Sequence, residues 1–478
     1  MAEIVKPLRI IKASFGSVLA VALAACASQG ARVPAAKTRE PASFATAQSF
    51  AAPAAAWPTE DWWKAYKDPQ LDALIAKGLQ NSPTLAQTEA RLRAADAAVG
   101  GARADARPDL TANVGVKEEK QSYNSGIPAP FVPHGYRDYG RATLDFSYTI
   151  DFWGKNRAAI AAAASTARAA KAEAADARLM LSTSIASTYA DLARLLAERD
   201  IAVKTLDLRT QTATLAQRRV KSGLDNRGEQ SQAEAGPPAA RAFIASLDEQ
   251  IGQTRNRIAA LMGAGPDRGL SITPPATAAT AGFGLPETLA LDLIGRRPDI
   301  VAARWRAEAA NKRVKQATAS FYPNVNLAAF FGAQSLLLSN IAQPGSDVGS
   351  YGTAISLPIF DAGRLRSNLR RADAERDQAV ATYNAALTEA LREIADIAAS
   401  ERALDKRLKE TKAALAANED AYRIAGLRYK GGLSTYQTVL IAEDAALSQR
   451  LAVADLESRR FTLDVALVRA LGGGFTAS

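Results

Sequence analysis

The sequence is nearly without cysteine, histidine and methionine: its 478 residues include 1 Cys, 1 His and 3 Met. One cysteine excludes a disulfide within the chain and any metal site built from several thiolates. The single histidine, His134, lies in a loop rich in proline and glycine, where a solvent-exposed ring is expected. No glycine-rich phosphate loop follows a strand, and no carboxylate pair stands apart from the many helical acids. The sequence therefore argues against an enzyme, and we expect no catalytic, metal or cofactor site.

Aromatic residues and clustered charge are also scarce. Aromatics make up 6% of the chain, and much of its 48% hydrophobic content is alanine, which favours thin, closely packed helices over a bulky core. The net charge is +10, but the basic residues alternate with acids, as they do from Arg364 to Asp377. That alternation is typical of solvated helix faces, so a nucleic-acid partner is not expected.

No run of apolar residues is as long as a membrane-spanning helix, which needs about 20. At the amino terminus, a basic stretch reaching Lys12 precedes an apolar run over residues 13–25 and then Cys26. Such a pattern predicts a signal peptide over residues 1–25. The small residues directly before Cys26 resemble a bacterial lipobox, which implies that Cys26 becomes the lipidated first residue of the mature chain; Ala27 resembles an outer-membrane sorting signal. Residues 26–60, rich in Ala, Pro, Ser and Thr, are then expected to be a lipid-anchored linker.

Two long stretches contain neither glycine nor proline, one between Gly154 and Gly223 and one between Gly363 and Gly426. Their high content of Ala, Leu, Arg, Glu and Lys predicts that both stretches are helices. The first would have about 68 residues and a length of about 100 Å. Each ends near a glycine turn and is followed by a returning helix, over residues 230–262 and 436–471. The expected units are two long antiparallel helical hairpins.

These stretches belong to an internal repeat, since Gly154 and Gly363, and likewise Gly223 and Gly432, lie 209 positions apart. Each half is expected to run helix, strand, loop, strand, long helix, turn, helix. The first helices, over residues 69–107 and 286–321, should stop before Pro108 and Pro323. The expected organisation is a first repeat over 61–265, a linker over 266–285, a second repeat over 286–472 and a tail over 473–478.

Four strands are expected, over residues 109–118, 140–150, 324–333 and 350–359. In the second, apolar and polar residues alternate almost completely. Period-two alternation fits a soluble sandwich or a membrane barrel, and the strands taken alone favour the soluble sandwich. The long helical rods favour the barrel, because strands of 9–11 residues cross a bilayer and four strands leave two edges that only other subunits can close. Arg141 and Asp145, on the polar face, are then candidate lumen residues.

One feature opposes the expected helices. Gly236, Pro237 and Pro238 lie inside the returning helix of the first half. Two prolines in a helix interior should break or kink it, at a cost of about 3 kcal/mol or more.

Several motifs together resemble the outer-membrane efflux protein family (TolC-like), and in particular its NodT-type lipoproteins. The motifs are the tryptophan-rich segment 57–69, Arg-Arg-Pro-Asp at 296–299, Ser-Phe-Tyr-Pro at 320–323, and Leu-Pro-Ile-Phe-Asp-Ala-Gly at 357–363. The resemblance implies a mainly α fold with a membrane β-barrel. Three chains would form a twelve-stranded outer-membrane barrel and a periplasmic α-barrel, with a belt from the termini and the linker.

The same resemblance implies an outer-membrane channel subunit of a tripartite efflux system, working with a periplasmic adaptor (membrane fusion) protein and an inner-membrane pump of the resistance-nodulation-division class. It also implies a periplasmic gate at Arg428 and Tyr429; the alternative is that Tyr429 packs the hairpin and Arg428 caps a helix end. Where relatives place an acid on the returning helix, this chain has Ile441, with Glu443 nearby. The alternatives are a lipid-anchored periplasmic adaptor or scaffold and a type I protein-secretion channel. The sequence contains no motif that identifies the cargo.

Overall fold

The computed structural model describes residues 34–46, 48–50, 55–124, 126–275, 283–286 and 289–477, so the predicted signal peptide and Cys26 lie outside the described residues. The chain divides into two compact units. Unit 1 combines Arg93–Ala169 and Ala303–Tyr383 with residues up to Thr38, and unit 2 combines Arg39–Leu92, Ala170–Ala302 and Asn384–Ser478. Each unit therefore takes segments from both halves of the sequence. In the described part of the chain, no helix combines the length and the apolar character that a bilayer crossing requires.

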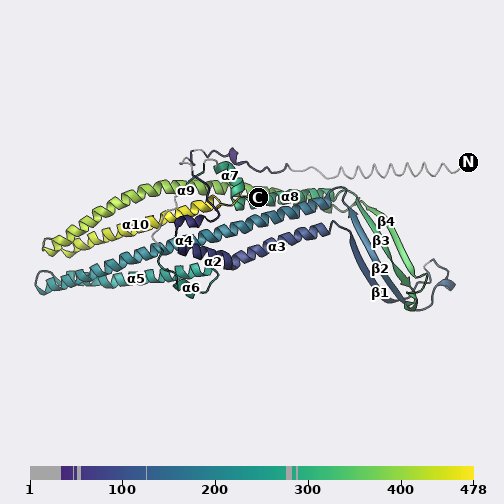
Figure 1. Cartoon of the computed structure of the whole chain (residues 1–478), viewed down its shortest axis with the longest axis horizontal. Helices are drawn as coiled ribbons and strands as arrows, with labels where there is room; N and C mark the ends of the chain where they lie inside the picture. The colour runs from purple at the N-terminus through teal and green to yellow at the C-terminus, as the bar shows by residue number, and fades with distance from the viewer. Residues whose placement is uncertain are drawn as a thin grey trace. The chain divides into compact units, whose positions relative to one another are not determined.

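Unit 1 contains one antiparallel sheet whose four strands follow chain order, β1-β2-β3-β4 (Figure 1). The strands are β1 (Asp109–Glu119), β2 (Arg137–Ile150), β3 (Asn324–Ser335) and β4 (Asp347–Ser356). The expected fourth strand reached residue 359, and that bound was wrong. The strand stops before Pro358, because proline has no N–H to donate to a strand ladder.

The strand register separates an apolar face from a polar face. Leu144 pairs with Ala112 on β1 and with Phe331 on β3, so these side chains share one face. Arg141 and Asp145 lie on the opposite face. Among the described residues, β1 pairs only with β2 and β4 only with β3, so each outer strand is unpaired along its other side. The sheet thus has two chemically distinct faces and two open edges.

Each half contributes one helix of 67 residues, α4 (Lys155–Lys221) and α9 (Arg364–Lys430). Both begin after a glycine with positive φ, Gly154 at 77° and Gly363 at 87°, a conformation that costs glycine little. An aspartate caps each start: the carboxylate of Asp151 accepts from the backbone N–H of Arg157, and that of Asp361 from Leu365.

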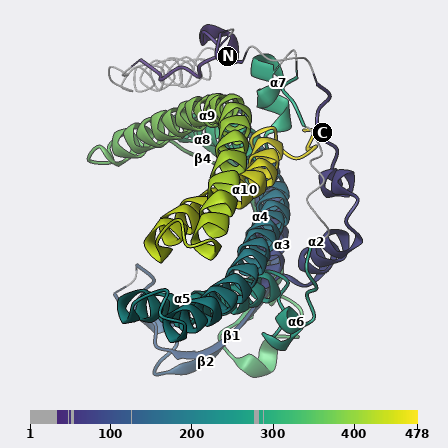
Figure 2. The ribbon, with the colours of Figure 1, turned by 90° about the vertical axis from the view of Figure 1, so that its left-hand side faces the viewer.

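The returning helices are α5 (Arg227–Leu261) and α10 (Tyr436–Ala470), each of 35 residues. Figures 1 and 2 show α5 lying along α4, and α10 along α9. Of the break or kink expected at Pro237 and Pro238, the break was wrong, since α5 continues through both prolines. Pro237, Ala233 and Ala240 form a buried stripe on α5, and we attribute the tolerance of the prolines to that tertiary packing.

The helices that open each half are shorter than expected, because each is divided at a proline. The first comprises α2 (Pro69–Asn81) and α3 (Pro83–Ala104), and the second α7 (Leu289–Arg296) and α8 (Pro298–Ala319). Ser82, before Pro83, is extended with ψ at 122°. A proline disfavours helical geometry in the residue before it, which explains the division.

The core of unit 2 gathers aromatic residues of the 3-10 helix η3 (Trp62–Tyr66) around α2, α4, α5 and α10. Tyr66 packs edge-on against Phe461, with the ring centroids 4.4 Å apart. Asp68 caps α2 and accepts a 2.7 Å hydrogen bond from the hydroxyl of Tyr189 on α4. The tryptophan-rich segment therefore anchors the residues before α2 to the long helices. The short helix α6 (Asp267–Leu270) follows α5.

Candidate functional site

The turns of the two hairpins have the same geometry. In the first turn, the backbone N–H of Leu224 donates to the carbonyl of Arg219, and the N–H of Gly223 donates to the carbonyl of Val220. In the second turn, the N–H of Leu433 donates to the carbonyl of Arg428, and the N–H of Gly432 donates to the carbonyl of Tyr429. This is the Schellman arrangement, which requires positive φ at the glycine, here 72° and 74°. Leu224 and Leu433 occupy the same position after their glycines and are 65% and 72% exposed. Both tips thus present an uncovered leucine.

A polar contact joins the two tips within unit 2. The hydroxyl of Tyr429, near the end of α9, donates a 2.7 Å hydrogen bond to Asp225 in the turn between α4 and α5. Arg219 donates to both oxygens of the same carboxylate, at 2.8 and 3.1 Å, and its guanidinium lies 4.8 Å from the centroid of the Tyr429 ring. The hydrogen bond from Arg219 holds the pKa of Asp225 below its usual value, so this contact persists in mildly acidic solution.

The structure separates the two residues predicted to form a gate. Tyr429 is 1% exposed and packs with Tyr436 and Val439 of α10 and with Ala216 and Ala233 of the other hairpin. Arg428 is exposed, and its side chain makes no hydrogen bond or ion pair within the described chain. Tyr429 therefore both packs the hairpins and bonds across them, whereas the Arg428 guanidinium remains available to a molecule outside this protomer.

A second ion pair links the hairpins farther from the turns. Arg209 of α4 donates from Nε to Glu443 of α10 at 2.6 Å and from Nη2 to Asp444 at 2.9 Å. Glu443 is 3% exposed, and its other oxygen has no partner among the described residues. Gly236 of α5 makes room for this pair, because an added Cβ would lie 3.3 Å from Cδ of Arg209. Gly236 thus has a packing reason that the sequence did not reveal.

Ile441, where an acid was expected by resemblance, is 64% exposed. Glu443, two residues on, turns to the opposite side of α10 and is buried against Arg209. The two residues are about 200° apart around the helix, so Glu443 cannot take the place of an acid at position 441.

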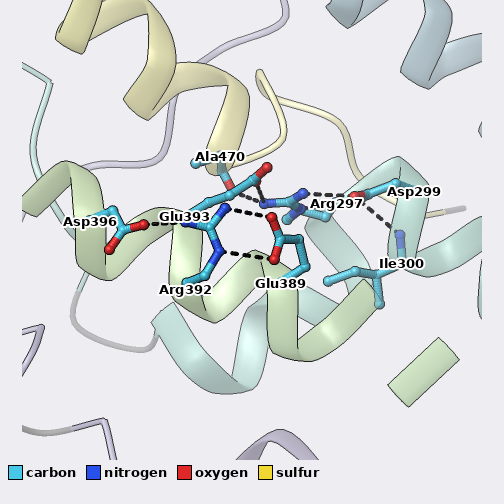
Figure 3. A network of polar contacts seen from close by, with 8 residues as sticks. All are labelled: Arg297, Asp299, Ile300, Glu389, Arg392, Glu393, Asp396 and Ala470. Carbon is cyan, nitrogen blue, oxygen red and sulfur yellow. Dashed lines mark hydrogen bonds and ion pairs between the residues drawn. The ribbon is translucent and has the colours of Figure 1, made fainter. Parts of the chain in front are cut away.

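An arginine of the motif at 296–299 lies at the centre of a larger network in unit 2 (Figure 3). Arg297 is 6% exposed; it donates to both oxygens of Asp299, at 3.1 and 2.7 Å, to Glu393 of α9 at 2.8 Å and to the carbonyl of Ala470 at 3.3 Å. Asp299 in turn accepts from the N–H of Ile300 in the first turn of α8. Arg297 thereby ties the junction of α7 and α8 to α9 and to the end of α10.

A partly buried acid on α9 is expected to make the stability of unit 2 depend on pH. Burial, followed by the nearby charges of Asp464 and Asp405, raises the pKa of Glu401 from 4.5 to about 7. Because the folded-state pKa is the higher one, the protonated form stabilises the fold, and this contribution is lost as pH rises from about 4.5 through 7. We expect Glu401→Gln, which mimics the protonated side chain, to raise the melting temperature by a few degrees at pH 8 and to change nothing at pH 4.5. Equal effects at both pH values would contradict this assignment.

The candidate lumen residues lie together on the polar face of the sheet in unit 1. The Asp145 carboxylate accepts hydrogen bonds from Asn113 and Thr143, each at 2.8 Å. The Arg141 guanidinium lies 5.1 Å from the centroid of the Phe330 ring. Both side chains thus project from the face opposite Leu144, as the alternation predicts.

Three residues at the contacts between the two hairpins were not identified from the sequence: Arg219, Asp225 and Arg209. The repeat contained a signal for the first, because Arg219 stands in the first half where Arg428 stands in the second. No local pattern identifies Arg209, whose partner Glu443 is 234 residues away.

The fold and these contacts define a class of protein. Its chain contains a sheet with an apolar face, a polar face and two open edges, and it contains two long helical hairpins that contact each other at their tips. The sequence matches the outer membrane efflux protein family over residues 74–264 and 289–473. The chain therefore belongs to the outer membrane efflux protein family, and it is an outer-membrane efflux channel protein. This membership removes the adaptor or scaffold alternative.

Individual relatives agree with this assignment. The chain is 37% identical to the fusaric acid resistance protein FusA of Burkholderia cepacia over 366 residues, which cover 75% of this chain and 69% of FusA. It is 32% identical to the multidrug resistance outer membrane protein MdtP of Escherichia coli, with 88% of each chain covered. The crystal structure of the outer membrane protein VceC of Vibrio cholerae shares 44% identity at a TM-score of 0.82, covering 88% of this chain and all of VceC.

Proposed function

We propose that this chain forms the passive outer-membrane duct of a tripartite efflux system. Three copies would close a twelve-stranded barrel and a periplasmic tunnel, and an inner-membrane pump of the resistance-nodulation-division class would deliver cargo through a periplasmic adaptor. The sheet carries this proposal: its four strands have an apolar and a polar face and two unpaired edges. Hydrocarbon does not tolerate open strand edges, so a barrel of such sheets must close between subunits.

Small organic molecules are the proposed cargo. Relatives named for fusaric acid resistance and for multidrug resistance support export of such molecules over protein secretion. The chain would supply a conduit and a gate, while the energy would come from the pump.

Cys26 is the proposed anchor of the duct to the outer membrane. Its lipid would anchor the amino terminus of the mature chain, and the barrel would supply a second attachment to the membrane. The test is to purify the protein from outer membranes in detergent, measure its mass, and follow incorporation of labelled palmitate in the parent and in Cys26→Ser. A trimer with label only in the parent is expected. A monomer would overturn the proposed assembly, and an unlabelled parent would overturn the anchor alone.

The tips are the proposed gate and the proposed docking point for the adaptor. Tyr429, bonded to Asp225, would hold the two hairpins of one subunit together, and the unpartnered Arg428 would engage a neighbouring subunit. Arg428→Ala is then expected to raise single-channel conductance. Unchanged conductance would leave Arg428 with no more than a helix-end role.

The exposed leucines at both tips are expected to bury against the adaptor. Replacing Leu224 and Leu433 with serine should weaken adaptor binding roughly a hundredfold, since burying each leucine contributes about 1.5 kcal/mol or more. The readout is the affinity of the purified channel for its adaptor, with drug susceptibility of cells as a second measure. Val203→Ser, at an exposed apolar position of α4 away from the tips, is the matched control. Equal weakening by Val203→Ser would refute docking at the tips.

A further inference from the structure

The polar face of the sheet contains a guanidinium whose N–H groups have no partner among the described residues. The Arg141 guanidinium makes no hydrogen bond or ion pair within the described residues; its contact is with the Phe330 ring. Asp145, four residues along the same strand, accepts hydrogen bonds from the amide of Asn113 and the hydroxyl of Thr143. The edges of the Arg141 guanidinium, which carry five N–H donors in a planar fork, are therefore unoccupied.

A hollow of about 410 Å³ lies beside this guanidinium, and it exists in part because the residue opposite Arg141 is a glycine. Gly115 pairs directly with Arg141, and a Cβ added to Gly115 would meet no atom within 4 Å. The volume falls in the range of small-molecule sites in proteins. The hollow is lined mainly by side chains of the polar face, namely Asn113, Lys117, Tyr139, Arg141 and Thr143.

The aromatic ring of Tyr139 and a second cation, Lys117, also line the hollow, next to Arg141 and Gly115. Tyr139 pairs with Lys117 across the strands, and the Lys117 ammonium lies 4.8 Å from the centroid of the tyrosine ring. Lys117 is also paired with Glu119, at 2.5 Å, so its charge is already compensated. The hollow thus has the free N–H groups of the Arg141 guanidinium on one side, and on the other the Tyr139 ring, which lies beside the Lys117 ammonium.

We propose that this hollow is a weak binding site for aromatic carboxylates in the wall of the barrel. The carboxylate would accept two N–H bonds from the fork of Arg141, the arrangement in which arginine binds carboxylates most strongly. The ligand ring would occupy the space above Gly115, against Tyr139, while Phe330 supports the guanidinium from below. Weak binding suits a conduit, because a molecule must be able to enter a site and leave it.

This inference rests on the proposed function, since the polar face lines water only if the sheet closes into a barrel. The test uses the full-length channel in planar bilayers and measures the concentrations at which benzoate, acetate, cyclohexanecarboxylate and benzylamine half-block the current. Benzoate should half-block the parent at a concentration roughly tenfold below that of acetate, with cyclohexanecarboxylate between them and no block by benzylamine.

Three substitutions separate the charge and the fork of Arg141 from the contact that the Phe330 ring makes with it. Arg141→Gln should raise the half-blocking concentration of benzoate about tenfold, Phe330→Leu about threefold, and Arg141→Lys should be intermediate, because lysine keeps the charge without the fork. Arg407→Gln removes the same charge from an exposed position of α9 in unit 2 and should leave the block unchanged.

The outcomes are distinguishable from failure of the channel itself. Absence of any conductance from the parent would overturn the proposed function. Normal conductance in potassium chloride for every variant, with benzoate block unaltered by Arg141→Gln, would overturn the site alone. An equal effect of Arg407→Gln, or equal potency of acetate and benzoate, would also overturn it, since either result reports only the overall charge of the conduit.

Discussion

Arg297→Ala is expected to prevent stable folding of the channel, with loss of about 3–5 kcal/mol, the usual consequence of removing one partner from a buried ion pair. The Arg297 guanidinium is 6% exposed and serves Asp299, Glu393 and the carbonyl of Ala470. Removing it leaves two partly buried carboxylates and one carbonyl without their donor. The measurements are the yield of trimer from outer membranes and the melting temperature in detergent.

Arg296→Ala provides the matched control for this experiment. The neighbouring arginine lies over the Trp57 ring, with its guanidinium carbon 4.9 Å from the ring centroid, a contact that contributes about 1 kcal/mol or less at a partly exposed position. Arg297→Lys should restore folding only in part, because a single ammonium cannot bind Asp299 through two parallel bonds. A melting temperature for Arg297→Ala equal to that of Arg296→Ala would refute a central role for Arg297.

Local patterns predicted the elements well, because their causes are local. Alternation over residues 140–150 located β2, and the absence of glycine and proline located α4 and α9. The divisions at Pro83 and Pro298 were also local, since each proline disfavours helix in the residue before it, but the surrounding helical pattern concealed them.

The interior of the tips could not be predicted in the same way. The contact between Tyr429 and Asp225 joins residues 204 positions apart, and which face of each helix turns toward the other depends on how the hairpins pack. The expectation of a broken α5 failed for a related reason. A helix propensity describes an isolated segment, whereas Pro237 is buried and Gly236 accommodates Arg209.

Tyr429→Phe is expected to increase the open fraction of the channel about fivefold. The substitution removes the hydroxyl that bonds Asp225 and keeps the ring that packs against Tyr436, so it deletes one hydrogen bond worth about 1 kcal/mol and little else. Single-channel recordings of the purified protein provide the measurement. Asp225→Asn should have a larger effect, because it also weakens the pair with Arg219.

Tyr422→Phe is the control for the hydroxyl. Tyr422 lies on the same helix and is partly buried near Glu443, but its hydroxyl makes no hydrogen bond within the described residues. Tyr422→Phe should therefore leave the open fraction unchanged. An equal increase in Tyr422→Phe and Tyr429→Phe would mean that the recordings report a general loosening of α9.

We expect the link between Arg209 and Glu443 to limit how far the tips can part. It joins the same two hairpins as Tyr429 does, but through a pair whose side chains are 13% and 4% exposed, so breaking it strands a buried carboxylate. The hairpins can therefore separate at the turns, where Tyr429 contributes about 1 kcal/mol, while staying joined at Arg209. Combining Tyr429→Phe with Arg209→Gln should raise the open fraction by more than the product of the single effects. A strictly multiplicative result would show that the two links act independently.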